Sequence, residues 1–96
     1  MTIRVLIKRK VVSGNELALA DLLTRLRALA LQAEGYISGE TLHSLDDPDE
    51  SLVISTWESL ERWRAWEAKP ERKELQAKID RFLVFPSEHR IMVYGA

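Results

Sequence analysis

The chain begins with a segment in which apolar residues occupy every second position. Ile3, Val5 and Ile7 follow this alternation, and all three are β-branched. A period of two with β-branched residues favours a β-strand over about residues 3–12. The basic run Lys8–Lys10 lies within it, and because consecutive strand residues point to opposite faces, these side chains cannot converge on one ligand. We therefore interpret the run as a solvated strand end.

The next segment has the three- and four-residue spacing of an amphipathic helix. Its apolar stripe consists of Leu19, Leu22, Leu23, Leu26, Leu29, Ala30 and Ala33. Ser13 and Glu16 have the spacing of a capping box, and Gly35 stands where a left-handed C-cap would be. We expect a helix over about residues 15–34 that turns this stripe toward the core.

Residues 36–45 alternate again, this time with polar side chains on both faces. The alternation places Thr41 and His43 on one side of the predicted strand and Tyr36 on the other. A face that carries Thr41 and His43 suits a cavity wall better than a dry core, because buried polar groups need hydrogen-bond partners. The acidic turn at 46–50 lacks the ligand spacing of a calcium loop, so we interpret it as a solvated hairpin tip.

The stretch from residue 52 to residue 66 carries all three tryptophans of the chain, Trp57, Trp63 and Trp66. Its first part predicts a strand over residues 51–57, antiparallel to the preceding strand because the loop between them is short. Trp63 and Trp66 are three residues apart, so on a helix they lie on the same side. This aromatic ridge is either core packing or the wall of a pocket for a flat apolar ligand.

A proline divides the helical region that contains these tryptophans. Ser59 has the residue type and position of an N-cap, and Pro70 predicts a break followed by a new helical start. The apolar stripe of the second part consists of Leu75, Ile79, Phe82 and Leu83. Pro86 ends this helix, and residues 90–94 form the last predicted strand.

The predicted order is β-α-β-β-α-β in a single domain over residues 1–96, which is the ferredoxin-like order of the α+β class. We expect a four-stranded antiparallel sheet with both helices on one face. The other face stays open. A second copy of the chain is expected to cover it, so the architecture predicts a homodimer.

The composition excludes several classes of function. The chain has 14 Lys and Arg against 15 Asp and Glu, a net charge of −1, so no overall field draws it to nucleic acid. It has no cysteine, which excludes disulfides and thiolate metal sites. The apolar stretch at the N-terminus is too short for a signal peptide or a membrane span, so we expect a cytoplasmic protein without a membrane partner.

The predicted first strand and the segment GYISGETLHSLDDPDESLVISTWESLERWRAWEAKPERKEL together resemble the antibiotic biosynthesis monooxygenase family of dimeric α+β barrels. The similarity lies in the Gly-Tyr entry to the second strand, the D-x-P hairpin tip, and the W-E-S step into a W-x-x-W helix. The resemblance implies a homodimer whose two sheets pack face to face. It also implies a small apolar cavity between the sheet and the helices of each subunit.

One branch of this family degrades haem, and this chain departs from its pattern. That branch carries an asparagine on the first strand, a helix tryptophan, and a histidine iron ligand ten residues after the tryptophan. Trp66 matches the tryptophan, but Gln76 stands at the histidine position, and Ile7 and Lys8 fall where the asparagine would be. Glutamine does not replace an imidazole ligand to haem iron. We therefore expect no haem, other metal or flavin cofactor.

The resemblance favours a cofactor-independent monooxygenase that acts on a small aromatic or quinol substrate. Such a reaction needs an apolar pocket, a base and exclusion of water. The candidate catalytic residues are Trp66 and His43, the latter as the only neutral-pH base near the middle of the fold. The candidate substrate-binding residues are Trp63, Tyr36 and Trp57. The alternative is a non-catalytic homodimer that binds a small apolar molecule, with His43 solvated and the tryptophans in the core.

Overall fold

The elements of the computed structural model, which describes residues 1–95, follow the order β-α-β-β-α-α-β. They are β1 (Ile3–Lys10), α1 (Glu16–Leu31), β2 (Tyr36–His43), β3 (Glu50–Trp57), α2 (Leu60–Glu67), α3 (Pro70–Asp80) and β4 (Glu88–Met92). The predicted ferredoxin-like order is confirmed. The second helical region is divided into α2 and α3 at the proline, as the sequence indicates.

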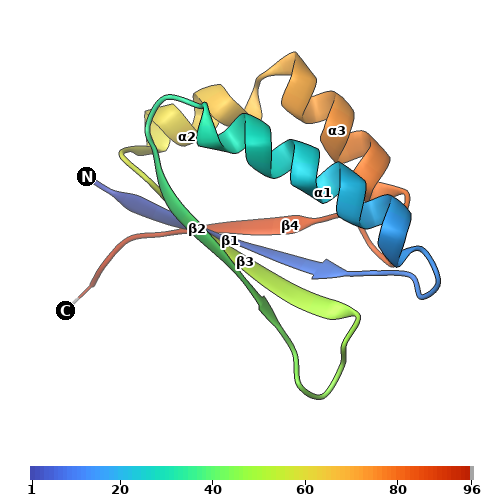
Figure 1. Cartoon of the computed structure of the whole chain (residues 1–96). Helices are drawn as coiled ribbons and strands as arrows, with labels where there is room; N and C mark the ends of the chain where they lie inside the picture. Colours follow the sequence, from blue (N-terminus) through green and yellow to red (C-terminus); the bar gives the residue numbers. More distant parts are fainter. Residues whose placement is uncertain (96) are drawn as a thin grey trace.

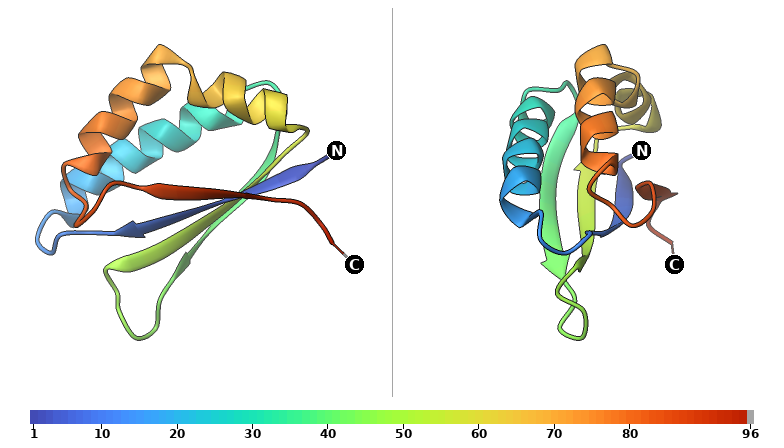
Figure 2. Two further views of the ribbon diagram at one scale, coloured as in Figure 1. Left: turned by 180° about the vertical axis from the view of Figure 1, so that it is seen from behind. Right: turned by 90° about the vertical axis from the view of Figure 1, so that its right-hand side faces the viewer.

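The strands form one antiparallel sheet in the order β2-β3-β1-β4. Figures 1 and 2 show the three helices on the same side of this sheet, as predicted. The alternation along β1 turns Ile3, Val5 and Arg9 toward the helices, where all three are buried. The inner face of the sheet is therefore apolar at one end of β1 and carries a charge at the other.

Two apolar clusters fill the two ends of the layer between the sheet and the helices. The first contains Ile3, Val5, Ala33 and the three tryptophans. The second contains Leu19, Ile79 and Leu83, where α1 meets the end of α3. The stripes predicted from the helical spacing supply the members of the second cluster, because residues three, four and seven apart share one helix face.

Local signals determine where the helices begin. α2 begins after Ser59 as predicted, and the Ser59 hydroxyl oxygen accepts a hydrogen bond from a first-turn backbone N–H at 3.2 Å. α3 begins at Pro70. Proline has no backbone N–H, but at the first helical position an N–H would have no partner within the helix, so nothing is lost there. The predicted capping box of α1 is wrong. Ser13 bonds to Asp49 instead, and the N-cap residue Asn15 makes no side-chain cap bond.

Some element ends differ from the predicted ones. α1 ends at Leu31, earlier than predicted, because the backbone N–H of Ala33 bonds three residues back in a tighter turn. β4 occupies Glu88–Met92 rather than 90–94, so His89 lies within the strand. None of the helices within residues 1–95 has the length and apolar character that crossing a membrane requires.

A β-bulge decides which face of β2 carries Tyr36. The pairing of β2 with β3 shifts register between Tyr36 and Ser38. The extra residue in one strand reverses the alternation at that point. Tyr36 therefore lies on the inner face with Gly39 and His43, and its predicted place on the opposite face is wrong.

No helix within residues 1–95 covers the outer face of the sheet, which lies on the side away from the three helices (Figure 2). Its apolar residues are Leu6, Leu42, Leu52, Ile54 and Met92. Leu42 is 49% and Met92 46% exposed. Lys8 also points to this side and forms an ion pair with Glu50 at 3.3 Å. The outer face thus combines an apolar patch with charged residues.

Candidate functional site

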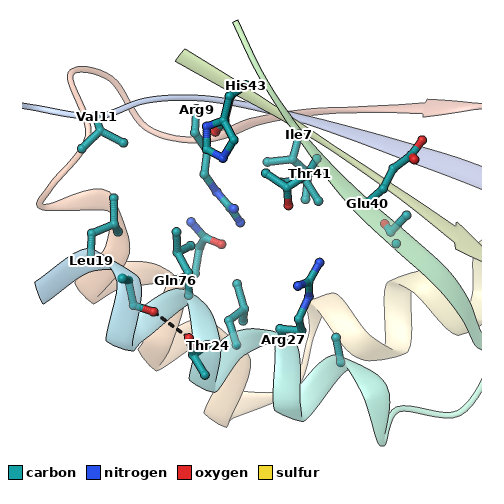
Figure 3. A pocket seen from close by; sticks show the side chains of 18 of the residues that line it. Ile7, Arg9, Val11, Leu19, Thr24, Arg27, Glu40, Thr41, His43 and Gln76 are labelled. Carbon is teal, nitrogen blue, oxygen red and sulfur yellow. Dashed lines mark hydrogen bonds between the residues drawn. The ribbon is translucent and has the colours of Figure 1, made fainter. Parts of the chain in front are cut away.

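A pocket with a volume of about 610 Å³ lies between the inner face of the sheet and the helices (Figure 3). β1, β2 and β3 form one wall, and residues of all three helices form the other. The volume lies within the range of pockets that hold small molecules. The residues singled out from the sequence all line it: His43, Trp66, Trp63, Tyr36 and Trp57.

Four aromatic side chains pack together at one end of this pocket. The Trp57 ring stacks on Trp66 with centroids 6.0 Å apart, and it meets Trp63 at 5.7 Å and Tyr36 at 5.3 Å in edge-on contacts. Trp57 and Trp63 are each 1% exposed, and Trp66 is 5% exposed. They are therefore core and pocket wall at once, rather than one or the other.

Three arginines line the same pocket, and two of them, Arg9 and Arg72, are more withdrawn from solvent than the exposed Arg27 of α1 (Figure 3). Arg9 of β1 is only 6% exposed and extends from the sheet into the pocket in the direction of Gln76 (Figure 3). Arg72, in the first turn of α3, holds its guanidinium over the Trp63 ring, 5.7 Å from the centroid. The interpretation of the basic run as a solvated strand end is wrong for Arg9. The alternation that sends the neighbouring lysines outward turns this arginine inward.

Burial lowers the pKa of both guanidinium groups, and the charge of Arg72 also acts on Arg9. Burial lowers the pKa of Arg9, and the positive charge of Arg72 lowers it further, while the Asp80 carboxylate acts in the opposite direction. Burial also lowers the pKa of Arg72, against the raising effect of Glu67 and Asp80. Neither arginine has an ion-pair partner among the described residues. The Nε–H of each is buried without an acceptor, and so is the Trp63 indole N–H.

Gln76 occupies the position at which the haem-degrading branch has its iron ligand. Its side-chain nitrogen donates to Asp80 Oδ1 at 2.8 Å and to Ser87 Oγ at 3.1 Å. A carboxamide is not among the side chains that ligate haem iron in proteins. Residues 1–95 also contain no cluster of three or more His, Cys, Asp or Glu side chains that could hold a metal ion. Gln76 therefore does not supply the iron ligand that the haem-degrading branch has at this position.

His43 lies at the opposite end of the pocket from the tryptophans. In the pairing of β2 with β3, His43 faces Ser51, whereas Tyr36 faces Trp57. The six residue steps between Ser51 and Trp57 along β3 span about 20 Å. The structure thus brings the four aromatic residues together but leaves the exposed His43 apart from Trp66. A ligand in contact with both would have to bridge the space between them.

The sequence analysis missed the two arginines, although the sequence holds a signal for each. Arg9 continues the series of inward positions that ends with Ile7, and a charged residue in such a series is rarely buried without a reason. Arg72 lies four residues before Gln76 and seven before the buried Ile79, so the three share one face of α3. The start of α3 at Pro70 determines that Arg72 and Gln76 lie on the same face as the buried Ile79 side chain.

Comparison with known proteins places this geometry in context. The family model described as antibiotic biosynthesis monooxygenase matches residues 2–78. Protein SchA of Streptomyces halstedii is 25% identical over 81 residues, which are 84% of this chain and 21% of SchA. The chain therefore spans about a fifth of the length of this curated relative.

Solved structures share the fold over nearly the whole chain. A conserved protein from Methanosarcina mazei Go1 has a TM-score of 0.92 at 20% identity, with 99% of this chain and 94% of that chain covered. SnoaB, a cofactor-independent oxygenase from Streptomyces nogalater, has a TM-score of 0.87 at 16% identity and the same coverage of both chains. Rv0793 from Mycobacterium tuberculosis has a TM-score of 0.87 at 16% identity, covering 100% of this chain and 97% of that chain. At these identities the likeness establishes the fold.

Proposed function

Because the chain belongs to the antibiotic biosynthesis monooxygenase family, we propose that it is a cofactor-independent monooxygenase of a small aromatic or quinol substrate. The observation that carries this proposal is the pocket of about 610 Å³, which has stacked tryptophans at one end within the fold of that family. Flat aromatic surfaces favour flat aromatic ligands, through offset stacking and burial of apolar area.

The proposed chemistry requires no cofactor, because the substrate itself supplies the electrons. Removal of a proton from a hydroxyl group or an activated CH₂ gives an electron-rich anion. The anion passes one electron to O₂, and the two radicals combine to form a C–O bond and, with a proton, a hydroperoxide. Loss of water then leaves a carbonyl group.

One oxygen atom enters the product, the other leaves as water, and the CH₂ carbon is oxidised by O₂. The protein has to hold the anion, move the proton and exclude solvent.

The pocket residues divide these tasks. Trp66, Trp63 and Trp57 form the apolar wall for the ring, and Tyr36 beside them is the hydrogen-bond donor. His43 accepts the proton, because it is the one residue of the pocket lining whose ordinary pKa lies near neutrality. Because the two ends lie about 20 Å apart along β3, this assignment requires a substrate that extends from the tryptophan end toward His43.

The proposal includes a homodimer formed through the outer face of the sheet. Among residues 1–95 no helix covers the apolar residues of that face, and two of them are about half exposed. A second copy would bury them and close the sheet side of the molecule, as fits a symmetric interface with an apolar centre. Such a partner would leave the pocket, which lies on the other side of the sheet, in place.

The alternative is a non-catalytic dimer that binds a small apolar molecule. It is favoured by the nearly complete burial of the tryptophans and by the exposure of His43, for which no hydrogen bond fixes the ring among residues 1–95. In this case the aromatic end serves the core and the binding of a ligand, without turnover.

Oxygen uptake by the purified, metal-free protein tests the proposal. Hydroquinones and anthrone are offered to the wild type, to His43→Ala, and to His89→Gln, in which the histidine whose ring lies 5.6 Å from the Trp63 ring is replaced. We expect uptake by the wild type and a loss of about a hundredfold or more in His43→Ala, the scale of general base catalysis. Such a loss in His89→Gln alone would assign the proton to His89 instead. Equal rates in all three proteins would exclude His43 as the base. No uptake with any substrate, together with measurable binding, would favour the non-catalytic alternative.

A further inference from the structure

Three buried hydrogen-bond donors on pocket-lining residues have no acceptor among residues 1–95. They are the Nε–H groups of Arg9 and Arg72 and the indole N–H of Trp63, each buried and unpaired. All three residues line the pocket. Arg72 connects the other two, because it covers the Trp63 ring and is close enough to Arg9 to lower its pKa. The unpaired donors therefore form one cluster rather than scattered defects.

The chain supplies too little negative charge to this cluster. Asp80 is the carboxylate that acts on both arginines, but its Oδ1 already accepts hydrogen bonds from Gln76 and from the Ser87 backbone N–H. Glu67 acts on Arg72 alone, and its Oε2 lies 3.4 Å from His89 Nε2. The carboxylates of the pocket lining itself are those of Glu16, Glu40 and Asp49, which are exposed or half-exposed. A buried guanidinium without a paired anion is costly, and two neighbouring ones are costlier. A ligand that carries the missing negative charge would relieve this cost.

We propose that Arg9, Arg72 and the Trp63 indole N–H bind a carboxylate carried by the aromatic ligand. This inference takes the pocket of the proposed function as its site and names the class of molecule that fits it. The planar fork of a guanidinium matches the two oxygens of a carboxylate, and with two forks and an N–H the cluster can satisfy several lone pairs. A single ionised ring hydroxyl offers one oxygen and would leave donors unpaired. The neighbouring tryptophans accommodate the ring to which the carboxylate is attached.

Calorimetric titration without turnover tests this separately from any oxygenase activity. The probes are naphthoate, its neutral isostere naphthalene methanol, and naphthol, whose ring hydroxyl the site would have to ionise. We expect naphthoate to bind to the wild type about ten- to a hundredfold more tightly than naphthalene methanol, the range of charge-assisted hydrogen bonds. The result does not depend on oxygen uptake, so a protein that fails as an oxygenase can still bind the carboxylate.

Arg9→Met and Arg72→Met identify the residues responsible. Each variant should lose most of the preference for naphthoate while its affinity for naphthalene methanol stays within a factor of about three. Arg9→Met replaces a buried charge by an apolar side chain of similar length, so without ligand this variant should unfold at the same temperature as the wild type or a higher one. Arg72 is half-buried and covers the Trp63 ring, so Arg72→Met should leave the unfolding temperature close to that of the wild type. The control is Arg64→Met, which makes the same substitution at an exposed position of α2 outside the pocket lining and should leave naphthoate binding unchanged.

Several outcomes would overturn the proposal. Equal binding of naphthoate and naphthalene methanol by the wild type would show that the cluster does not recognise an anion. Tighter binding of naphthol than of naphthoate would assign the cluster to an ionised hydroxyl instead. A clearly lower unfolding temperature in both Arg9→Met and Arg72→Met would show that the arginines serve the fold.

Discussion

At the scale of single residues, two glycines control the space around the aromatic end. A Cβ added at Gly39 would meet the Tyr36 hydroxyl oxygen at 2.5 Å. Gly35 has a φ of +86°, a conformation that L side chains rarely adopt, and a Cβ there would collide with the Arg62 side chain. Gly39 leaves room for the hydroxyl group at the end of the flexible Tyr36 side chain. At residue 35 the backbone conformation itself requires a glycine.

Gly39→Ala should move Tyr36 without unfolding the protein. The added methyl group displaces the tyrosine hydroxyl, which is the far end of a flexible side chain, so the strand backbone need not change. Alanine is also less disordered than glycine in the unfolded chain, so we expect the free energy of unfolding to change by less than about 1 kcal/mol. The position of the proposed donor changes, so hydroquinone turnover should fall severalfold. Chemical denaturation and oxygen uptake measure the two effects.

Gly35→Ala is the contrasting variant. Forcing an alanine into the left-handed region costs about 1–2 kcal/mol of folding free energy before the collision with Arg62 is counted. Gly39→Ala could instead destabilise the protein as much as Gly35→Ala. Tyr36 would then be held rigidly by its other contacts, and the added methyl group could not displace it without cost.

The strands, the helices and the helix break could be predicted from the sequence, because alternation, helical spacing and proline each act locally. The face of Tyr36 could not, because a bulge inserts one residue and regular alternation contains no sign of it. The burial of Arg9 was also missed. Its inward position follows from the alternation, but whether a charge at that position is solvated depends on α3, which packs from a distant part of the chain.

At the scale of elements, the N-termini of α1 and α2 differ in how they are capped. Ser59 caps α2 with its hydroxyl oxygen, whereas the N-cap residue of α1, Asn15, makes no side-chain cap bond. α2 is only eight residues long and carries Trp63 and Trp66 into the core. A short helix depends more on its end contacts than a long one, because few internal hydrogen bonds hold it.

Ser59→Ala should therefore destabilise the protein by about 1 kcal/mol, the usual cost of removing an N-cap side chain. Thermal denaturation followed by tryptophan fluorescence measures the change. Ser59→Asp restores an N-cap acceptor and should recover the loss, while Asn15→Ala, a matched change at an uncapped helix start, should cost clearly less. Equal losses at the two positions would contradict the role assigned to the Ser59 hydroxyl.

At the scale of the whole molecule, the two faces of the sheet serve different purposes. The inner face carries the aromatic residues, Arg9 and the pocket, and the helices cover it. The outer face carries an apolar patch at the centre of which Ile54 pairs with Leu6 on the neighbouring strand. Because the pocket does not use this patch, a change on the outer face should affect association without changing the inner wall.

Ile54→Lys should convert the proposed dimer into a monomer, because it places a charge at the centre of an interface that has to exclude water. In sedimentation equilibrium at micromolar concentration, we expect the wild type at twice the 11.0 kDa mass of the chain and the variant at that mass. Leu17→Lys is the control, since Leu17 is 89% exposed on α1, on the helix side of the molecule, and its replacement should leave the dimer intact.

A monomeric wild type would refute the dimer outright. A dimeric Ile54→Lys variant would move the interface away from the outer face. Retention of naphthoate binding by a monomeric Ile54→Lys variant would show that one chain is sufficient to build the pocket.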